Sequence, residues 1–309
     1  ISLPMHPAMQ NRLKEVGQTI FSDGVVKYTS TIGNKETRDA FLNILQAEGI
    51  NTSNIFSNIT DGGSSAMELM MLGVCGPGSS DPIMLLDPAY TNYLEFAKRL
   101  AIDVVTVPRL INDDGSFADL NMKEVESKIK KYKPNALLVI PYDNPTGQFL
   151  TQQTLIELAK ICVKYSIWLV SDEAYRPLFY NEDVQSSIWN ISEKRVPGIN
   201  GCRISIESSS KVWNACGLRI GAILTDNEEF HLKAISEYTA NLCANAIGQK
   251  IFGALAHESH EEIQLWYESQ RNYYKKILLN LKDQFQKQIP GLIVSNPAAA
   301  LYCIIDFRK

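Results

Sequence analysis

Long apolar runs are missing from this sequence, and so is a secretion signal. No stretch approaches the roughly 20 consecutive apolar residues that a membrane-spanning helix needs. The first residues, 1–10, do not combine a basic start with a following apolar stretch. We therefore expect neither a membrane partner nor secretion.

Cysteine pairs and clustered positive charge are missing as well. The six cysteines are widely spaced and form no Cys-x-x-Cys pair, which argues against a zinc site and against a disulfide framework. The formal net charge is -4 and the basic residues are dispersed, so the sequence offers no basic stripe for a nucleic acid. These features predict a cytoplasmic protein without a nucleic-acid partner.

The composition is that of a globular protein with a large buried core. Of the 309 residues, 45% are hydrophobic and 21% are charged. Short apolar runs alternate with segments of helical periodicity, and the runs 136–140 and 167–170 are apolar on both faces, as central strands of a covered parallel sheet are. The pattern predicts an α/β protein, a three-layer α/β/α sandwich with a mainly parallel sheet of seven strands. The expected strands are 55–60, 82–86, 103–108, 136–141, 167–171, 202–207 and 220–225.

The helical pattern changes towards the end of the chain. A helix is expected at 151–165, with apolar residues that would pack on the sheet. From Glu228 to about Gln286 the pattern is almost wholly helical, and strand-like stretches follow at 291–294 and 301–307. We interpret the helical stretch as a long connecting helix that leads to a smaller α+β domain.

Two segments carry residues suited to binding an anion and an aldehyde. In Thr60-Asp-Gly-Gly-Ser-Ser, small residues open a helix after a strand, which would let N–H groups and hydroxyls approach a phosphate. Lys211 follows another strand in Ser208-Ser-Ser-Lys211, and Arg219 lies eight residues later in Gly217-Leu-Arg-Ile-Gly221. A lysine amine can form a Schiff base, whereas an arginine fork suits a phosphate. Taken singly, each segment is more often a tight turn or a solvated charge.

Together, these motifs resemble the lysine signature and phosphate turn of the class I and II aminotransferases, which are fold-type-I pyridoxal-phosphate (PLP) enzymes. Further motifs occur in the family's order, and the resemblance runs from about Tyr28 to Gly221. They are Tyr28 with Gly33 and Arg38, Asp87-Pro-Ala-Tyr90, Asn144-Pro-Thr-Gly147, and Ser171-Asp-Glu-Ala-Tyr175.

The resemblance implies PLP as the cofactor, with Lys211, Asp172 and Tyr175 as catalytic residues. Lys211 would hold PLP as a Schiff base, and Asp172 would keep the pyridine nitrogen protonated so that the ring accepts electrons. Tyr175 and Asn144 would hydrogen-bond the phenolic oxygen of the ring, and Tyr90 would stack on the ring. The commoner structural roles of these residue types are a turn acid, an Asn-Pro turn and core aromatics.

The remaining cofactor-binding residues are also implied by the resemblance. Gly63, Ser64, Ser208 and Arg219 would hold the phosphate, with Ser65 beside them. Tyr28 lies in a segment that resembles the one by which the family crosses to the partner subunit. A homodimer with shared active sites is therefore implied, in which Tyr28 donates its hydroxyl to the neighbour's phosphate.

The implied reaction is transfer of an amino group from an L-amino acid to a 2-oxo acid, with Lys211 moving the proton. Two other functions remain open: a fold-type-I PLP lyase that catalyses β-elimination from a sulfur amino acid, and a PLP-fold regulatory domain.

The implied domains are an N-terminal segment of the small domain (1–25), a large PLP-binding domain (26–275) and a C-terminal small domain (276–309). The family's arginine for the substrate carboxylate lies farther past the lysine than this chain extends. We therefore expect the small domain to be incomplete.

Two other features have ordinary explanations. His257 and His260 could in principle bind a metal, but no third ligand is evident, and a solvated helix face is the commoner arrangement. Cys216 has no histidine nearby in sequence to activate it, and we expect a small buried side chain.

Overall fold

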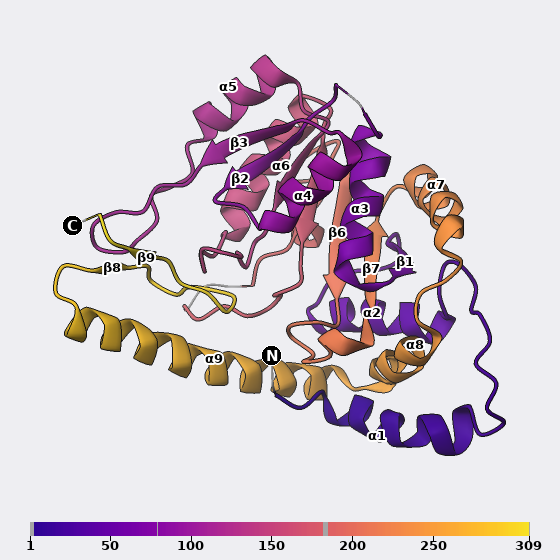
Figure 1. The fold of residues 1–309 in the computed structure, drawn as a ribbon. Helices are drawn as coiled ribbons and strands as arrows, with labels where there is room; N and C mark the ends of the chain where they lie inside the picture. Colours follow the sequence, from indigo (N-terminus) through magenta and orange to yellow (C-terminus); the bar gives the residue numbers. More distant parts are fainter. Residues whose placement is uncertain (1–2, 79, 182–184, 309) are drawn as a thin grey trace. The chain divides into compact units, whose positions relative to one another are not determined.

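The computed structural model describes residues 3–78, 80–181 and 185–308, in which helices and strands alternate along most of the chain (Figure 1). The chain divides into two compact units. The first unit comprises Ile1–Gly73 and Asn200–Trp266, and the second comprises Val74–Ile199 and Tyr267–Lys309.

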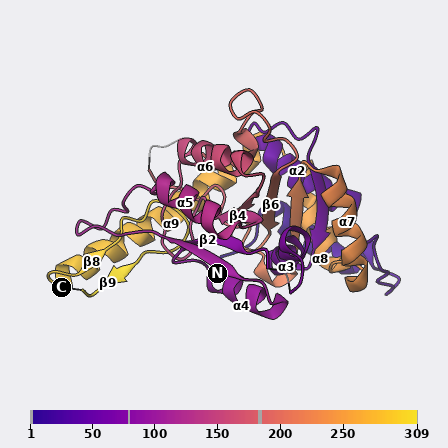
Figure 2. The ribbon, with the colours of Figure 1, turned by 90° about the horizontal axis from the view of Figure 1, so that it is seen from above.

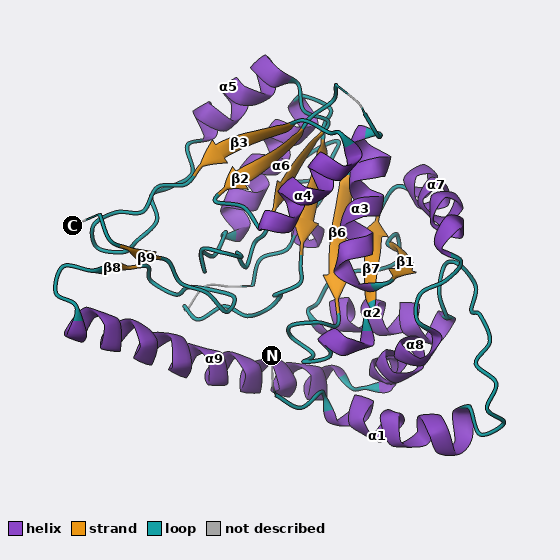
Figure 3. Cartoon of the chain, in the orientation of Figure 1, coloured by secondary structure: helices purple, strands orange, loops and turns teal. Residues whose placement is uncertain are grey.

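The first unit contains three strands and the helices around them (Figure 3). Strand β7 pairs antiparallel with both β1 and β6, with Thr60 and Ser208 each opposite Gly221. The elements are α1 (Pro7–Glu15), η1 (Val16–Ile20), α2 (Lys35–Ala47), β1 (Phe56–Thr60), β6 (Arg203–Ser208), η3 (Cys216–Leu218), β7 (Gly221–Thr225), α7 (Glu228–Tyr238), η4 (Thr239–Asn241), α8 (Ala246–Phe252) and η5 (Gly253–His257). Helices α3 (Gly62–Cys75) and α9 (His260–Gln288) begin in this unit and end in the second.

The second unit contains parallel strands linked by helices. Strand β2 pairs in parallel with β3 and β4, and β4 pairs in parallel with β5. A separate pair, β8 and β9, lies beside the C-terminal part of α9 (Figure 2). The elements are β2 (Ile83–Asp87), α4 (Thr91–Leu100), β3 (Val104–Pro108), α5 (Met122–Tyr132), β4 (Ala136–Val139), α6 (Gln152–Lys164), β5 (Trp168–Asp172), η2 (Ile188–Asn190), β8 (Ile293–Val294) and β9 (Ile305–Asp306).

The predicted α/β architecture is confirmed. The sheet has seven strands, in the order β1-β7-β6 in the first unit and β5-β4-β2-β3 in the second. All seven predicted strands are present, and none of their ends differs by more than two residues from the prediction. Strand β4 is buried at every position, which explains why its sequence is apolar on both faces.

Local sequence explains where helix α6 begins and which face it buries. The hydroxyl of Thr151 accepts a hydrogen bond from the N–H of Thr154, which caps the helix N-terminus. Leu155, Leu158 and Cys162 are buried, at the three- and four-residue spacing of one helical face.

The expectation of one long connecting helix is only partly met. The stretch from Glu228 to Gln286 is divided among α7, α8 and α9, of which only α9 is long. Leu242 has φ 66°, and the Asn245 side chain accepts hydrogen bonds from the N–H groups of Ile247 and Gly248. A left-handed residue and a new helix cap interrupt the helical backbone there. None of the helices in the described ranges is both long and apolar enough to cross a membrane.

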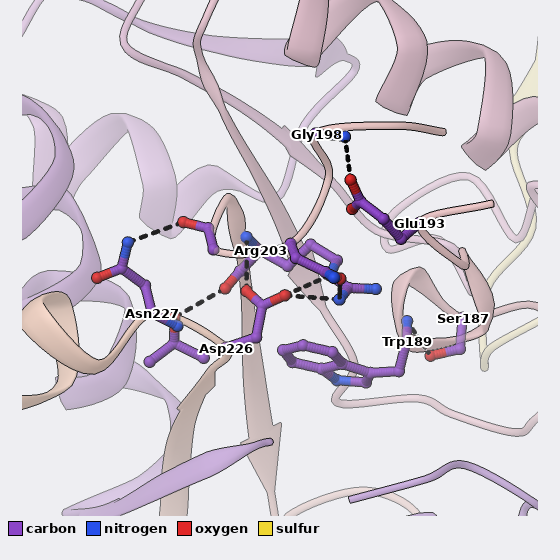
Figure 4. Close-up of polar contacts among 10 residues, drawn as sticks. Ser187, Trp189, Glu193, Gly198, Arg203, Asp226 and Asn227 are labelled. Carbon is purple, nitrogen blue, oxygen red and sulfur yellow. Dashed lines mark hydrogen bonds and ion pairs between the residues drawn. The ribbon is translucent and has the colours of Figure 1, made fainter. Parts of the chain in front are cut away.

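A buried ion pair joins the start of β6 to the end of β7 within the first unit. The side-chain exposures of Arg203 and Asp226 are 8% and 5%, and the shortest N–O distance between them is 2.6 Å. Figure 4 shows the carboxylate of Asp226 facing the guanidinium of Arg203, which donates from Nε at 2.9 Å as well. Removing one partner of such a pair leaves the other charge buried without compensation.

We therefore expect Asp226→Ala to lower the free energy of unfolding by about 3–5 kcal/mol. The control is Glu229→Ala, which removes the ion pair between Glu229 and Lys233. Its N–O distance is also 2.6 Å, but the side chains of Lys233 and Glu229 are 75% and 77% exposed. This control should cost at most about 1 kcal/mol, because water solvates both charges. Urea unfolding of the two variants measures the difference, and equal losses would contradict the role given to burial.

Candidate active site

The predicted phosphate turn lies between β1 and α3 in the first unit. Strand β1 ends at Thr60, whose hydroxyl donates to the carbonyl of Gly62 at 3.0 Å, and α3 begins at Gly62. The first N–H groups of a helix have no carbonyl partner within the helix and carry partial positive charge. Gly63, Ser64 and Ser65 lie in this first turn, and the Ser65 hydroxyl donates to the carbonyl of Asp61 at 3.3 Å.

Arg219 lies over this turn because residue 62 has no side chain. A Cβ atom built on Gly62 would lie 2.5 Å from Nη2 of Arg219 and 2.9 Å from its Cζ. Gly62 also has φ +75°, a conformation that side chains disfavour. The guanidinium thus occupies space next to the N-terminus of α3 that the side chain of any other residue at position 62 would fill. The positive guanidinium and the N–H groups of the helix N-terminus both favour binding of an anion.

Gly221, at the start of β7, allows the same close approach. A Cβ atom on Gly221 would collide with the backbone of Gly62 and Gly63. The sequence motif Gly217-x-Arg219-x-Gly221 therefore includes one glycine with a steric role, since a Cβ on Gly217 would meet nothing within 4 Å.

Ser208 approaches the same turn from β6, and Lys211 follows three residues later. Ser208 is the last residue of β6, and the Cβ position of Gly63 lies 3.6 Å from Cβ of Ser208. The next residue, Ser209, donates from both its N–H and its hydroxyl to the carbonyl of Ile220 at 2.9 Å. These bonds tie the Lys211 turn to the segment that carries Arg219. The Lys211 side chain is half-buried.

We expect Gly221→Ala to weaken binding of a phosphate-bearing ligand by tenfold or more, because its methyl group would push the Gly62–Gly63 backbone away from Arg219. Gly217→Ala should bind normally and serves as the control from the same turn. Equilibrium dialysis with PLP measures the dissociation constant of each variant, and circular dichroism checks that both variants fold. Normal binding by a folded Gly221→Ala protein would contradict the steric role.

In the second unit, Asp172 lies at the end of β5 and is 3% exposed. Its Oδ2 accepts a hydrogen bond from the hydroxyl of Tyr93, and its Oδ1 accepts one from the N–H of Ala174 at 3.0 Å. Burial, and then the negative charge of Asp172, raise the pKa of Tyr93. Tyr93 is therefore held as a neutral donor to the carboxylate.

Asn144 and Tyr175, which the family resemblance assigns to the same oxygen of the cofactor, are in contact. Nδ2 of Asn144 donates to the hydroxyl of Tyr175 at 3.1 Å. The Tyr175 hydroxyl also contacts the hydroxyl of Tyr302 at 2.6 Å. Burial, followed by the hydrogen bond with Tyr302, raises the pKa of Tyr175. Tyr175 thus remains a neutral phenol that can both donate and accept.

The turn that bears Asn144 is anchored by a buried ion pair. Arg109 Nη1 lies 2.9 Å from Oδ1 of Asp143, with 2% and 3% of the two side chains exposed. Arg109 also donates to the carbonyl of Pro88, two residues before Tyr90. The other oxygen of Asp143 accepts from the N–H and the hydroxyl of Thr146.

Tyr90 and Tyr28 differ in their surroundings. The Tyr90 ring is half-buried and meets the ring of Tyr93 edge to face, with 5.7 Å between the centroids. Tyr28 lies in the first unit and is 79% exposed. The neighbouring Thr29 is held by a hydrogen bond from Gln249 at 3.0 Å.

Several functional candidates were not evident from sequence. Tyr93 and Tyr302 contact the predicted site residues Asp172 and Tyr175, and Arg109 pairs with Asp143, the neighbour of Asn144. The only signals were the three-residue spacing of Tyr90 and Tyr93 at the start of α4 and the position of Arg109 just after β3.

The expectation for Cys216 was wrong. It is exposed, because it lies in the short η3 turn rather than on a packed face. His257 and His260 contact Glu36 and Asn43 at 2.9 and 3.2 Å, respectively. In the part of the chain that the structure describes, no three His, Cys, Asp or Glu residues are grouped to hold a metal.

A comparison with protein families identifies the family of the chain. Residues 8–309 match the family model described as aminotransferase class I and II. The chain belongs to this family. An aspartate aminotransferase of Sulfurisphaera tokodaii is 28% identical over 296 residues, which cover 94% of this chain and 69% of that protein. An aspartate aminotransferase of Pinus pinaster is 30% identical over 210 residues, or 67% of this chain and 40% of that protein.

Solved structures show the same fold. A mutant aspartate aminotransferase of Thermus thermophilus matches with a TM-score of 0.82 and 23% identity, covering 99% of this chain and 78% of that one. A PLP-bound C-S lyase from Staphylococcus hominis also matches with a TM-score of 0.82, at 18% identity, over 99% of this chain and 73% of that one.

As a member of this family, the aminotransferase uses PLP. The observed residues fit that cofactor. The space beside Gly62, the Arg219 guanidinium and the start of α3 suit a phosphate, and the buried Asp172 carboxylate suits a protonated ring nitrogen.

Proposed function

We propose that this aminotransferase transfers the amino group of an L-amino acid to a 2-oxo acid, with Lys211 as the residue that attaches the cofactor. The observation that carries the assignment is the position of Lys211, three residues past β6 on a turn tied to the Arg219 segment. Aspartate is the first donor to test, because relatives such as the Sulfurisphaera protein are aspartate aminotransferases.

When bound, PLP supplies an aldehyde that condenses with amines and a pyridinium ring that accepts electrons. In this proposal, Nζ of Lys211 would attach the cofactor and, as a free amine, would remove the proton from the substrate Cα. Asp172 would hold a proton on the ring nitrogen, and Tyr93, which donates to Asp172, would keep its carboxylate oriented.

Further residues would bind and orient the ring and its phosphate. Tyr175 and Asn144 would hydrogen-bond the phenolic oxygen, and Tyr90 would cover one face of the ring. The phosphate would be held by Gly63, Ser64, Ser65, Ser208 and Arg219.

A β-eliminating lyase is the second candidate, since the Staphylococcus C-S lyase has the same fold. The same cofactor site serves either reaction, because the fold does not determine which bond at Cα breaks. Incubating the holoenzyme with cystathionine or aspartate, each with and without 2-oxoglutarate, separates the two. Oxo-acid release that requires the acceptor supports transamination, whereas release without an acceptor supports the lyase.

We expect Lys211→Ala to abolish covalent trapping of PLP by borohydride and to reduce turnover by at least about a thousandfold. Lys233→Ala, on the exposed face of α7, is the matched control and should retain both. Peptide mapping after reduction identifies the modified lysine. Cofactor trapped on another lysine would refute the assignment.

We also propose a cytoplasmic homodimer in which Tyr28 acts in the partner's active site. The 79% exposed side chain of Tyr28 is available to a second subunit, and the six cysteines form no disulfide. From the family resemblance, we propose that residues 1–25 and 276–309 belong to a small domain and residues 26–275 to a large one.

Mixed dimers test the Tyr28 role. If Tyr28 serves the partner's phosphate, a dimer of one Tyr28→Phe subunit and one Lys211→Ala subunit contains one complete site, which should retain PLP as tightly as wild type. The Tyr28→Phe homodimer should lose PLP about tenfold more readily. Cofactor release during gel filtration of tag-purified mixed dimers measures this. If the subunit that keeps Lys211 in the mixed dimer releases PLP as readily as the Tyr28→Phe homodimer does, Tyr28 acts in the site of its own subunit.

A further inference from the structure

Two polar groups converge at the hydroxyl of Tyr175 within the second unit. Asn144 Nδ2 lies 3.1 Å from this oxygen and the hydroxyl of Tyr302 lies 2.6 Å from it. The rings of Tyr175 and Tyr302 pack edge to face, with centroids 5.6 Å apart and an interplanar angle of 76°. Tyr175 is 3% exposed, whereas Tyr302 is half-buried.

The donors and lone pairs of Tyr175 and its partners limit the direction of the hydrogen bond between Tyr175 and Tyr302. A phenol has one hydrogen to donate and accepts through its oxygen lone pairs. The amide nitrogen of Asn144 can only donate, so it occupies one acceptor position of Tyr175. If Tyr302 donates as well, the acceptor capacity of Tyr175 is filled and its single hydrogen is left to point at another acceptor. If Tyr175 donated to Tyr302 instead, no hydrogen would remain for a ligand.

The backbone holds Tyr302 in this position. The carbonyl of Gly147 accepts hydrogen bonds from the N–H groups of Ala298 and Ala299, at 3.0 and 2.8 Å. Gly147 has φ +70°, and a Cβ atom there would collide with the carbonyl oxygen of Tyr302. The Asn144–Gly147 turn therefore positions Asn144 directly and also fixes the segment 298–302. Both hydrogen-bond partners of Tyr175 depend on one turn.

We propose that Tyr302 is a positioning residue that donates to the Tyr175 hydroxyl and thereby directs the Tyr175 hydrogen at the phenolic oxygen of PLP. The inference rests on the proposed cofactor role of Tyr175 and adds a residue that the family resemblance did not supply. Hydrogen bonds in a chain polarise one another, so a donated bond from Tyr302 also makes Tyr175 a stronger donor. Electrostatic interactions with Asp172 and Tyr90 also raise the pKa of Tyr175.

The consequence is measurable in the holoenzyme's visible absorption. A hydrogen bond to the phenolic oxygen stabilises its negative charge most when Nζ of the attached Lys211 has lost its proton. Weakening that bond should therefore raise the pH at which the absorption band changes. We expect Tyr302→Phe to move this midpoint upward by about 0.5–1 pH unit, and Tyr175→Phe to move it farther in the same direction.

Cys303→Ala is the matched control, because it alters the adjacent residue and leaves the Tyr302 hydroxyl in place; its midpoint should equal that of wild type. Tyr302→Phe keeps the ring, and circular dichroism of the apoprotein checks that it folds. Gly147→Ala, which displaces the segment 298–302 without removing either hydroxyl, is the second variant and should also raise the midpoint.

These variants test the positioning role of Tyr302 and the cofactor role of Tyr175 separately. A raised midpoint in Tyr302→Phe, with Cys303→Ala unchanged, supports the positioning role. An unchanged midpoint in Tyr302→Phe beside a raised one in Tyr175→Phe overturns the role of Tyr302 alone. If Tyr302→Phe does not fold, an unchanged midpoint in Gly147→Ala overturns it in the same way. If Tyr175→Phe also leaves the midpoint unchanged, the proposed cofactor role of Tyr175 fails.

Discussion

The buried ion pair between Arg109 and Asp143 constrains the polar residues of the second unit. A carboxylate that is 3% exposed needs donors on its oxygens, and Arg109 and Thr146 supply them. Because Asp143 is fixed, the following turn is fixed, and with it Asn144 and the carbonyl of Gly147. Arg109 also binds the carbonyl of Pro88, which adds the Tyr90 segment to the residues that it positions. One guanidinium thus orders two segments that carry proposed cofactor residues.

The sequence was informative about features that depend on local spacing. Lys211, Arg219 and the Gly62–Ser65 turn follow strands whose apolar runs were visible, and all seven strands were predicted to within two residues. The order of these motifs also sufficed to suggest the family that the comparison then showed.

Contacts between residues distant in the chain could not be predicted in this way. Tyr175 and Tyr302 are 127 residues apart, and Tyr93 and Asp172 are 79 apart, so no periodicity connects them. The break between α7 and α8 depends on a left-handed Leu242, an unusual conformation for a branched residue. Cys216 was misjudged because burial in a three-residue turn follows from tertiary packing, which residue type alone does not indicate.

The fit between Gly62 and Arg219 also limits how this family member can diverge. A side chain at position 62 and a guanidinium over the turn require the same space, so the two positions cannot change independently. A substitution at position 62 would first have to be accommodated by the loss or withdrawal of the arginine, and the intermediate sequence would bind the phosphate poorly. Among homologues, glycine at position 62 and arginine at position 219 should therefore be gained and lost together, and their covariation would record this steric exclusion.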